Sequence, residues 1–164
     1  MQLTLEVNRA IRSGLSGDLD QAEHWLRRAE LEHQDLVEHG MRNVVLNAWC
    51  RPANEKGEFQ ADWTELQRTL DLCKKYGFRG PYAMHINASG IYRKVTGESW
   101  GPHTKDAKVP PPQYAKELTA MTRFIESERE KYGWPKFLYY PVDEPGRHPE
   151  SVELMRITLK AIRE

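Results

Sequence analysis

Three helix ends with the same residue pattern constrain the fold of this chain more than any other feature. The pattern is a glycine followed by an apolar residue, and it occurs at His39-Gly40-Met41, Tyr76-Gly77-Phe78 and Tyr132-Gly133-Trp134. Glycine takes the left-handed conformation that closes a helix, and the apolar residue after it packs back on the last turn. An apolar segment typical of a strand follows each glycine within a few residues. The chain therefore alternates helices and strands, which predicts a parallel sheet with right-handed crossovers.

Four segments have the composition of strands. Leu3, Leu5 and Val7 alternate with polar residues, and the other three segments are largely apolar. The predicted strands lie within residues 2–8, 41–49, 82–86 and 136–142. Residues 9–17 carry two glycines and two serines, which predicts a loop. Each strand is followed by a predicted helix, so the chain is expected to contain four consecutive βα units.

Each predicted helix has a start signal and an apolar stripe. Asp18 with Gln21, and Asp62 with Glu65, have the spacing of capping boxes, and prolines open the helices at residues 111 and 149. His33 lies on the stripe of the first helix, where a satisfied core or boundary histidine is the expected interpretation. In the third helix the stripe is Tyr114, Leu118, Met121 and Ile125, and in the last it is Val152, Met155, Leu159 and Ile162.

Two connections have no predicted helix or strand. Residues 50–61 are polar and include Pro52 and Gly57. Residues 88–110 exceed the roughly 12-residue limit of ordinary loops, and such long loops are often functional or mobile. This second segment carries Tyr92, Trp100 and His103. We therefore expect it to be a mobile loop over the strand ends.

Two architectures accommodate four βα units: an open doubly wound sheet and half of a (β/α)8 barrel. A doubly wound nucleotide-binding fold requires a glycine-rich turn after its first strand, and Arg12–Gly17 has only scattered glycines. Polar and aromatic residues follow the later strands, as at the catalytic end of a barrel. The sequence predicts an α/β protein with an incomplete (β/α)8 TIM barrel, a single domain over residues 1–164, and no cofactor.

The predicted strand ends supply the candidate binding residues. Aromatic faces stack on sugar rings, while amides and carboxylates bind hydroxyl groups. The candidates for substrate binding are Asn47, Trp49, His85, Asn87, Trp100 and Tyr140. Asp143 and Glu144 follow the last strand directly, and we predict that they are the catalytic pair. In the alternative interpretation, Asp143-Glu144-Pro145 begins a loop or caps the next helix.

These residues resemble the catalytic barrel of glycoside hydrolase family 123 and its uncharacterised relatives. The resemblance rests on Asp143-Glu144-Pro145, on Asp35–Asn43 and on Lys74–Phe78, and it covers most of residues 18–145. It implies substrate-assisted, retaining hydrolysis of N-acetylhexosaminides, with Glu144 as general acid/base and Asp143 orienting the 2-acetamido group. A complete barrel needs about 250 residues. The resemblance therefore implies the N-terminal half of a barrel, completed by a missing C-terminal half or by self-association.

Composition argues against several other classes. Lys plus Arg and Asp plus Glu balance at 24 each, so we expect no nucleic-acid and no membrane partner. No apolar run approaches the ~20 residues of a membrane span, and the first residues lack the pattern of a signal peptide. Cys50 and Cys73 have no metal-site spacing and are expected to be buried thiols.

Three functional hypotheses remain open at this point. The first is a hydrolase with a carbohydrate substrate, and the second is a carbohydrate-binding fragment without turnover. The third is a metallohydrolase that would use His85, His103, His148, Asp143 and Glu144. No two of these histidines have the spacing of a metal motif on one element, so no metal is expected.

Overall fold

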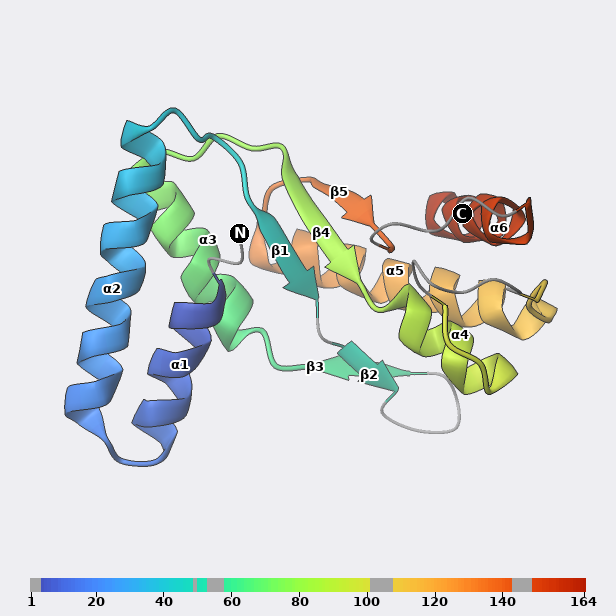
Figure 1. Cartoon of the computed structure of the whole chain (residues 1–164), viewed down its shortest axis with the longest axis horizontal. Coiled ribbons are helices and arrows are strands. Elements are labelled where there is room, and N and C mark those ends of the chain that lie inside the picture. Colours follow the sequence, from blue (N-terminus) through green and yellow to red (C-terminus); the bar gives the residue numbers. More distant parts are fainter. Residues whose placement is uncertain (1–3, 49, 53–57, 101–107, 143–148) are drawn as a thin grey trace. The chain divides into compact units, whose positions relative to one another are not determined.

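The computed structural model describes residues 4–48, 50–52, 58–100, 108–142 and 149–164 (Figure 1). The helices are α1 (Thr4–Leu15), α2 (Leu19–Glu38), α3 (Thr64–Tyr76), α4 (Ala88–Thr96), α5 (Pro112–Tyr132) and α6 (Pro149–Arg163). The strands are β1 (Val45–Ala48), β2 (Cys50–Pro52), β3 (Phe59–Ala61), β4 (Tyr82–Ile86) and β5 (Phe137–Tyr140).

The described strands form two small sheets. A parallel sheet has the order β1-β4-β5, and an antiparallel hairpin pairs β2 with β3, with Cys50 opposite Ala61 and Arg51 opposite Gln60. The predicted incomplete TIM barrel of four consecutive βα units is therefore wrong. The parallel sheet has one strand fewer than predicted, and a hairpin stands in the connection between β1 and β4.

The missing strand is the predicted N-terminal one, because residues 4–15 form α1. Over residues 2–8 alone the apolar positions alternate, but over a longer window Val7, Ala10 and Ile11 follow the helical spacing i, i+3, i+4. Ala10 is buried, and Ile11 packs against Ala29 and Leu72. The seven-residue window was too short to distinguish the two periods. The loop predicted over residues 9–17 from its glycines and serines is limited to residues 16 and 17, because residues 9–15 belong to α1.

The chain divides into two compact units. One comprises Met1–Asn47 and Asp62–Met84, and the other comprises Ala48–Ala61 and His85–Glu164. We call them unit 1 and unit 2. The core of unit 1 includes Ala29 on α2 with Leu72 and Cys73 on α3.

The core of unit 2 is organised by α5. The four residues of its predicted stripe, Tyr114, Leu118, Met121 and Ile125, are all buried, so that prediction is confirmed. Phe59 of β3 stacks on Phe124 of α5, with ring centroids 6.1 Å apart. The polar connection predicted over residues 50–61 therefore includes a hairpin that packs on this helix.

The three helix ends singled out in the sequence all close in the predicted way. Gly40, Gly77 and Gly133 have φ angles of 88°, 82° and 67°. The residue after each glycine donates its backbone N–H to a carbonyl five residues earlier, at 2.9 Å in every case. These bonds are Met41 to Leu36, Phe78 to Cys73 and Trp134 to Arg129, the Schellman pattern.

We expect Gly77→Ala to destabilise the protein by about 1–2 kcal/mol, because the left-handed conformation is costly for a residue with a Cβ. A Cβ at Gly77 meets no atom within 4 Å, so the cost is in the backbone. The matched control is Gly14→Ala in α1, where the new Cβ would lie 3.8 Å from the Cβ of Ala22. This change should stabilise by about 0.5–1 kcal/mol. Chemical denaturation measures the change in unfolding free energy of both variants. A change of the same sign in both would contradict the backbone origin of the effect at Gly77.

The buried face of α6 differs from the predicted one. Its core residues are Ser151, Leu154, Thr158 and Ala161, not Val152, Met155, Leu159 and Ile162. The reason is contact with α5, since Tyr114 Oη and Thr158 Oγ1 share a hydrogen bond of 2.7 Å and Thr119 donates to the Ala161 carbonyl at 2.8 Å. Small and hydroxyl-bearing residues face α5, and a pattern of hydrophobicity alone does not show them.

The long loop predicted over residues 88–110 was also wrong, because residues 88–96 form α4. Asn87 caps this helix by accepting a hydrogen bond from the Gly90 N–H at 3.0 Å. Tyr92 is buried, and its hydroxyl donates to the Lys108 carbonyl at 3.0 Å. The part of this segment that the structure describes is therefore packed, and His103 lies outside the described residues.

His33 is a core histidine, as predicted. Its Nδ1 lies 2.6 Å from the Ala29 carbonyl oxygen, which fixes the proton on Nδ1. Nε2 is buried and has no hydrogen-bond partner among the described residues. The Phe78 ring lies edge-on at 5.7 Å and the Tyr76 ring at 6.4 Å. Burial lowers the pKa of His33 below its ordinary value. The hydrogen bond to the Ala29 carbonyl and the charge of Glu32 raise the pKa, but their effect is smaller.

We expect the protein to lose stability as the pH falls below about 6.5, the ordinary pKa of histidine. In that range the unfolded chain binds a proton at residue 33 that the folded chain does not, so acid favours unfolding. Denaturation at pH values between 7 and 5 should show a loss of unfolding free energy, and His33→Phe should make that loss smaller. The control His24→Asn changes an exposed histidine on α2 and should keep the loss. An unchanged pH dependence in His33→Phe would contradict the role of this residue.

Candidate functional site

The candidate site lies at the carboxyl ends of β4 and β5, in unit 2. His85 comes from β4 and Tyr140 from β5, and both are half-buried. Their ring centroids are 5.8 Å apart and the rings are tilted by 54°. Neighbouring parallel strands end at the same edge of a sheet, which is where α/β proteins bind ligands. Of the candidates predicted from sequence, these two side chains are brought together.

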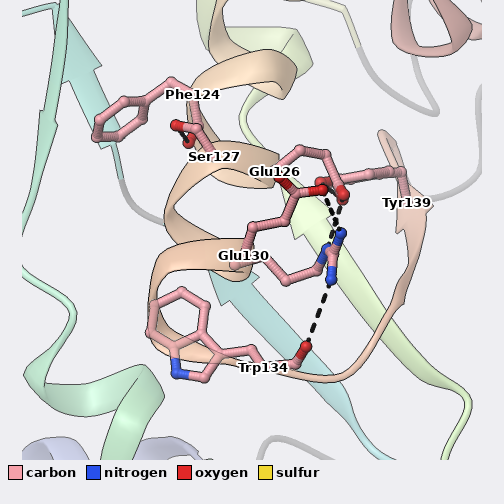
Figure 2. Close-up of polar contacts among 7 residues, drawn as sticks. Phe124, Glu126, Ser127, Glu130, Trp134 and Tyr139 are labelled. Atoms are coloured by element: carbon pink, nitrogen blue, oxygen red, sulfur yellow. Dashed lines mark hydrogen bonds and ion pairs between the residues drawn. The ribbon is translucent and has the colours of Figure 1, made fainter.

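Tyr139, the residue before Tyr140, points to the other face of β5, because successive strand residues alternate. Its hydroxyl donates a hydrogen bond of 2.5 Å to Oε1 of Glu126 on α5. Figure 2 shows this pair where β5 runs past α5. Burial raises the pKa of Tyr139, and the neighbouring Glu126 carboxylate raises it further. Tyr139 is therefore a neutral hydrogen-bond donor, and it fixes β5 to the helix.

Arg129 completes this contact from the next turn of α5. Its Nε donates to Glu126 Oε2 at 2.7 Å, so the two carboxylate oxygens bind different partners. The guanidinium also reaches Glu130 at 3.2 Å and the Trp134 carbonyl at 3.5 Å, the latter drawn in Figure 2. Glu126, Arg129 and Tyr139 join the end of α5 to β5 and hold the strand that carries Tyr140.

Asn87, a predicted substrate-binding residue, also caps α4. Its Oδ1 accepts the Gly90 N–H, and a Cβ at Gly90 would come within 2.4 Å of the Asn87 amide. The cap thus requires a glycine at that position.

The remaining predicted binding residues are dispersed. Trp100 is only 5% exposed, and its ring lies 6.2 Å from that of Tyr92. In this structure it is a core residue, which argues against a role in stacking on a sugar. Asn47 is half-buried on β1 and belongs to unit 1. Trp49, Asp143 and Glu144 lie outside the described residues.

Neither cysteine has the character of a nucleophile. Burial raises the pKa of the Cys50 thiol to about 11 and that of Cys73 to about 12. Both are therefore protonated thiols near neutral pH, and a reactive cysteine requires the opposite shift. Cys73 is buried as predicted, whereas Cys50 on β2 is partly exposed.

Within the described segments, no group of three or more His, Cys, Asp and Glu side chains could hold a metal ion. Most residues of the metallohydrolase hypothesis, namely His103, Asp143, Glu144 and His148, fall outside those segments. His85, the remaining one, packs against Tyr140.

Sequence reasoning missed the contact among Glu126, Arg129 and Tyr139. Glu126 and Arg129 are three residues apart on α5, which places them on neighbouring positions of one helix face. That spacing was the available signal, but it occurs on most exposed helices. Only the pairing of α5 with β5 distinguishes this ion pair from the others.

The described helices are all too short or too polar to cross a bilayer. Comparison of the chain with protein-family models, with curated proteins and with solved structures finds no significant match.

Proposed function

We propose that this chain is a glycoside hydrolase-like domain that acts on N-acetylhexosaminides with participation of the substrate's own acetamido group. The observation that carries the proposal is the His85–Tyr140 ring pair at 5.8 Å. It stands at the carboxyl ends of two parallel strands, and Asp143 and Glu144 follow Tyr140 in the sequence after Pro141 and Val142. Ring faces for a sugar and carboxylates in the same strand-end segment are the components that glycoside chemistry requires.

The two carboxylates have different roles in this proposal. Glu144 protonates the leaving oxygen and later activates water, while Asp143 orients the acetamido group and stabilises its developing charge. Ordinary retaining enzymes need a second carboxylate about 5–5.5 Å away as the nucleophile. Participation of the acetamido oxygen removes that need, so residues of this chain suffice for the chemistry.

Contacts between α5 and β5 hold the strand that carries one of the two rings. The contact of Glu126, Arg129 and Tyr139 fixes β5 to α5, so the Tyr140 ring has a rigid base. Sites built on such fixed elements lose less conformational entropy when a ligand binds.

The test is turnover of a chromogenic N-acetylhexosaminide, compared with the plain hexoside that lacks the acetamido group. We expect hydrolysis of the first and at least a hundredfold slower hydrolysis of the second, because the second has no internal nucleophile. Equal rates on the two sugars would contradict acetamido participation. Binding of the N-acetylated sugar without turnover would instead favour the carbohydrate-binding alternative.

A further inference from the structure

The second half of α2 and the turn after it are held in unit 1 by one fully buried side chain. Of residues 30–43, all of which the structure describes, His33 alone is fully buried. The other residues of this segment are exposed or half-buried. Ala29 before the segment and Val44 after it are buried and fix its two ends. The packing of the 30–43 segment therefore depends strongly on a residue that can take up a proton.

The surroundings of His33 suit the neutral ring. Its Nδ1 donates to the Ala29 carbonyl at 2.6 Å, and Nε2 is buried with no hydrogen-bond partner among the described residues. A second proton would add a positive charge and a new donor at Nε2. The side chains beside it are the rings of Tyr76 and Phe78, at 6.4 and 5.7 Å between centroids. Because a buried charge without a hydrogen-bond partner is strongly unfavourable, the ring can take up this proton only by leaving the core.

The charged and titratable groups around His33 do not compensate for such a proton. On α2 the Glu32 carboxylate raises the pKa of His33, but burial lowers it by more. The titratable side chains that α3 adds are Tyr76, Cys73 and Lys75, which is bound to Glu30 at 2.7 Å. A tyrosine and a thiol are uncharged below pH 7, and a lysine has the same sign of charge as a protonated histidine. From α1 the core of unit 1 receives the apolar side chain of Ile11.

We propose that His33 makes the 30–43 segment a pH-sensitive switch, in which uptake of a proton in mild acid detaches the segment from unit 1 while the rest of the chain stays folded. Below about pH 6.5 the detached segment binds a proton that the packed segment excludes, so acid shifts the equilibrium toward detachment. Segments with little buried side-chain surface are the ones that open locally, at a lower free energy than global unfolding. Detachment uncovers the rings of Tyr76 and Phe78, which the segment covers at neutral pH.

Two backbone hydrogen bonds report whether the segment is in place. The N–H groups of Arg79 and Gly80 both bind the Arg42 carbonyl, at 3.0 and 3.1 Å, so they lose this acceptor when the segment leaves. Two other N–H groups serve as references, since that of Phe78 is bound within the end of α3 and that of Trp134 within the end of α5, each at 2.9 Å. Both references should remain protected if the 30–43 segment moves alone.

The test is amide hydrogen exchange, followed by NMR on the whole chain between pH 7 and pH 5 and corrected for the intrinsic effect of pH on exchange. We expect the protection of Arg79 and Gly80 to fall by roughly tenfold over this range, because a group that binds its proton only when exposed changes the opening equilibrium by up to tenfold per pH unit. The amides of Phe78 and Trp134 should keep their protection. No fall at Arg79 and Gly80, or an equal fall at Trp134, would overturn the proposal.

Two variants assign the effect to one histidine. His33→Phe keeps a ring in the core but has no group that takes up a proton, so protection of Arg79 and Gly80 should become independent of pH. The matched control His24→Asn alters an exposed histidine on the same helix and should retain the fall. The unaltered chain gives a second readout, because the ring-proton resonance of His33 should titrate over the same pH range as the loss of protection. A fall that persists in His33→Phe, or a His33 resonance that does not change while protection is lost, would contradict the switch.

Discussion

Glu144→Gln is expected to lower turnover of an N-acetylhexosaminide by about 10² to 10⁴, the contribution of general acid/base catalysis. Glutamine keeps the size of the side chain but cannot deliver a proton. The loss should be smallest for substrates with good leaving groups, because those depart without protonation. Measuring kcat/KM over a series of aryl leaving groups tests this directly.

Two variants serve as comparisons for Glu144→Gln. Asp143→Asn should also lower kcat but keep the dependence on the leaving group, because it weakens the alignment of the acetamido nucleophile instead. Glu23→Gln makes the same chemical change at an exposed position on α2 and should leave turnover unaltered. If both active-site variants only lowered the melting temperature while kcat stayed constant, the acidic pair would be a structural cap and the proposed mechanism would fail.

The sequence predicted those elements whose signals are local. The Schellman endings at Gly40, Gly77 and Gly133 need only two adjacent residues, and all three are present. The strand over residues 82–86 was predicted with its observed bounds. Buried residues alternate with half-buried ones along it, as the two-residue period of a strand requires. The Asp18 cap was also correct, since its carboxylate accepts the Gln21 N–H at 3.0 Å.

What the sequence did not predict depends on contacts between distant segments. The barrel was inferred from four βα units, and it failed because α1 replaced one strand and the β2–β3 hairpin interrupted the repeat. Nothing within residues 50–61 signals that Phe59 will stack on Phe124, more than sixty residues away. Hydrophobic periodicity fixes the type of an element far better than it fixes its partner.

The residues of the candidate site also divide into those with a local signal in the sequence and those that depend on contacts between distant segments. His85 and Tyr140 were found because they end apolar strands, a local feature, and the structure brings their rings together. Trp100 was chosen on its position in a supposed loop, but it is buried beside Tyr92. Residue type alone could not distinguish an aromatic that faces a ligand from one that fills a core.

The second large effect is expected in α6, where the sequence and the structure assign different faces to the core. Leu154→Ala should cost about 2–5 kcal/mol of unfolding free energy, because Leu154 is 0% exposed and truncation leaves a cavity against α5. Leu159→Ala makes the same change five residues away at a position that is 41% exposed. It should cost less than about 1 kcal/mol, since most of the removed surface already faces water.

Both α6 variants have the same helix propensity and the same change in volume, so the difference between them reports burial alone. Urea denaturation should be repeated at several protein concentrations, because any association of the folded chain would add stability that depends on concentration. At the lowest concentration Leu154→Ala should remain the more damaging change by more than about 1 kcal/mol. A larger loss in Leu159→Ala under those conditions would mean that α6 buries Val152, Met155, Leu159 and Ile162 within its own chain.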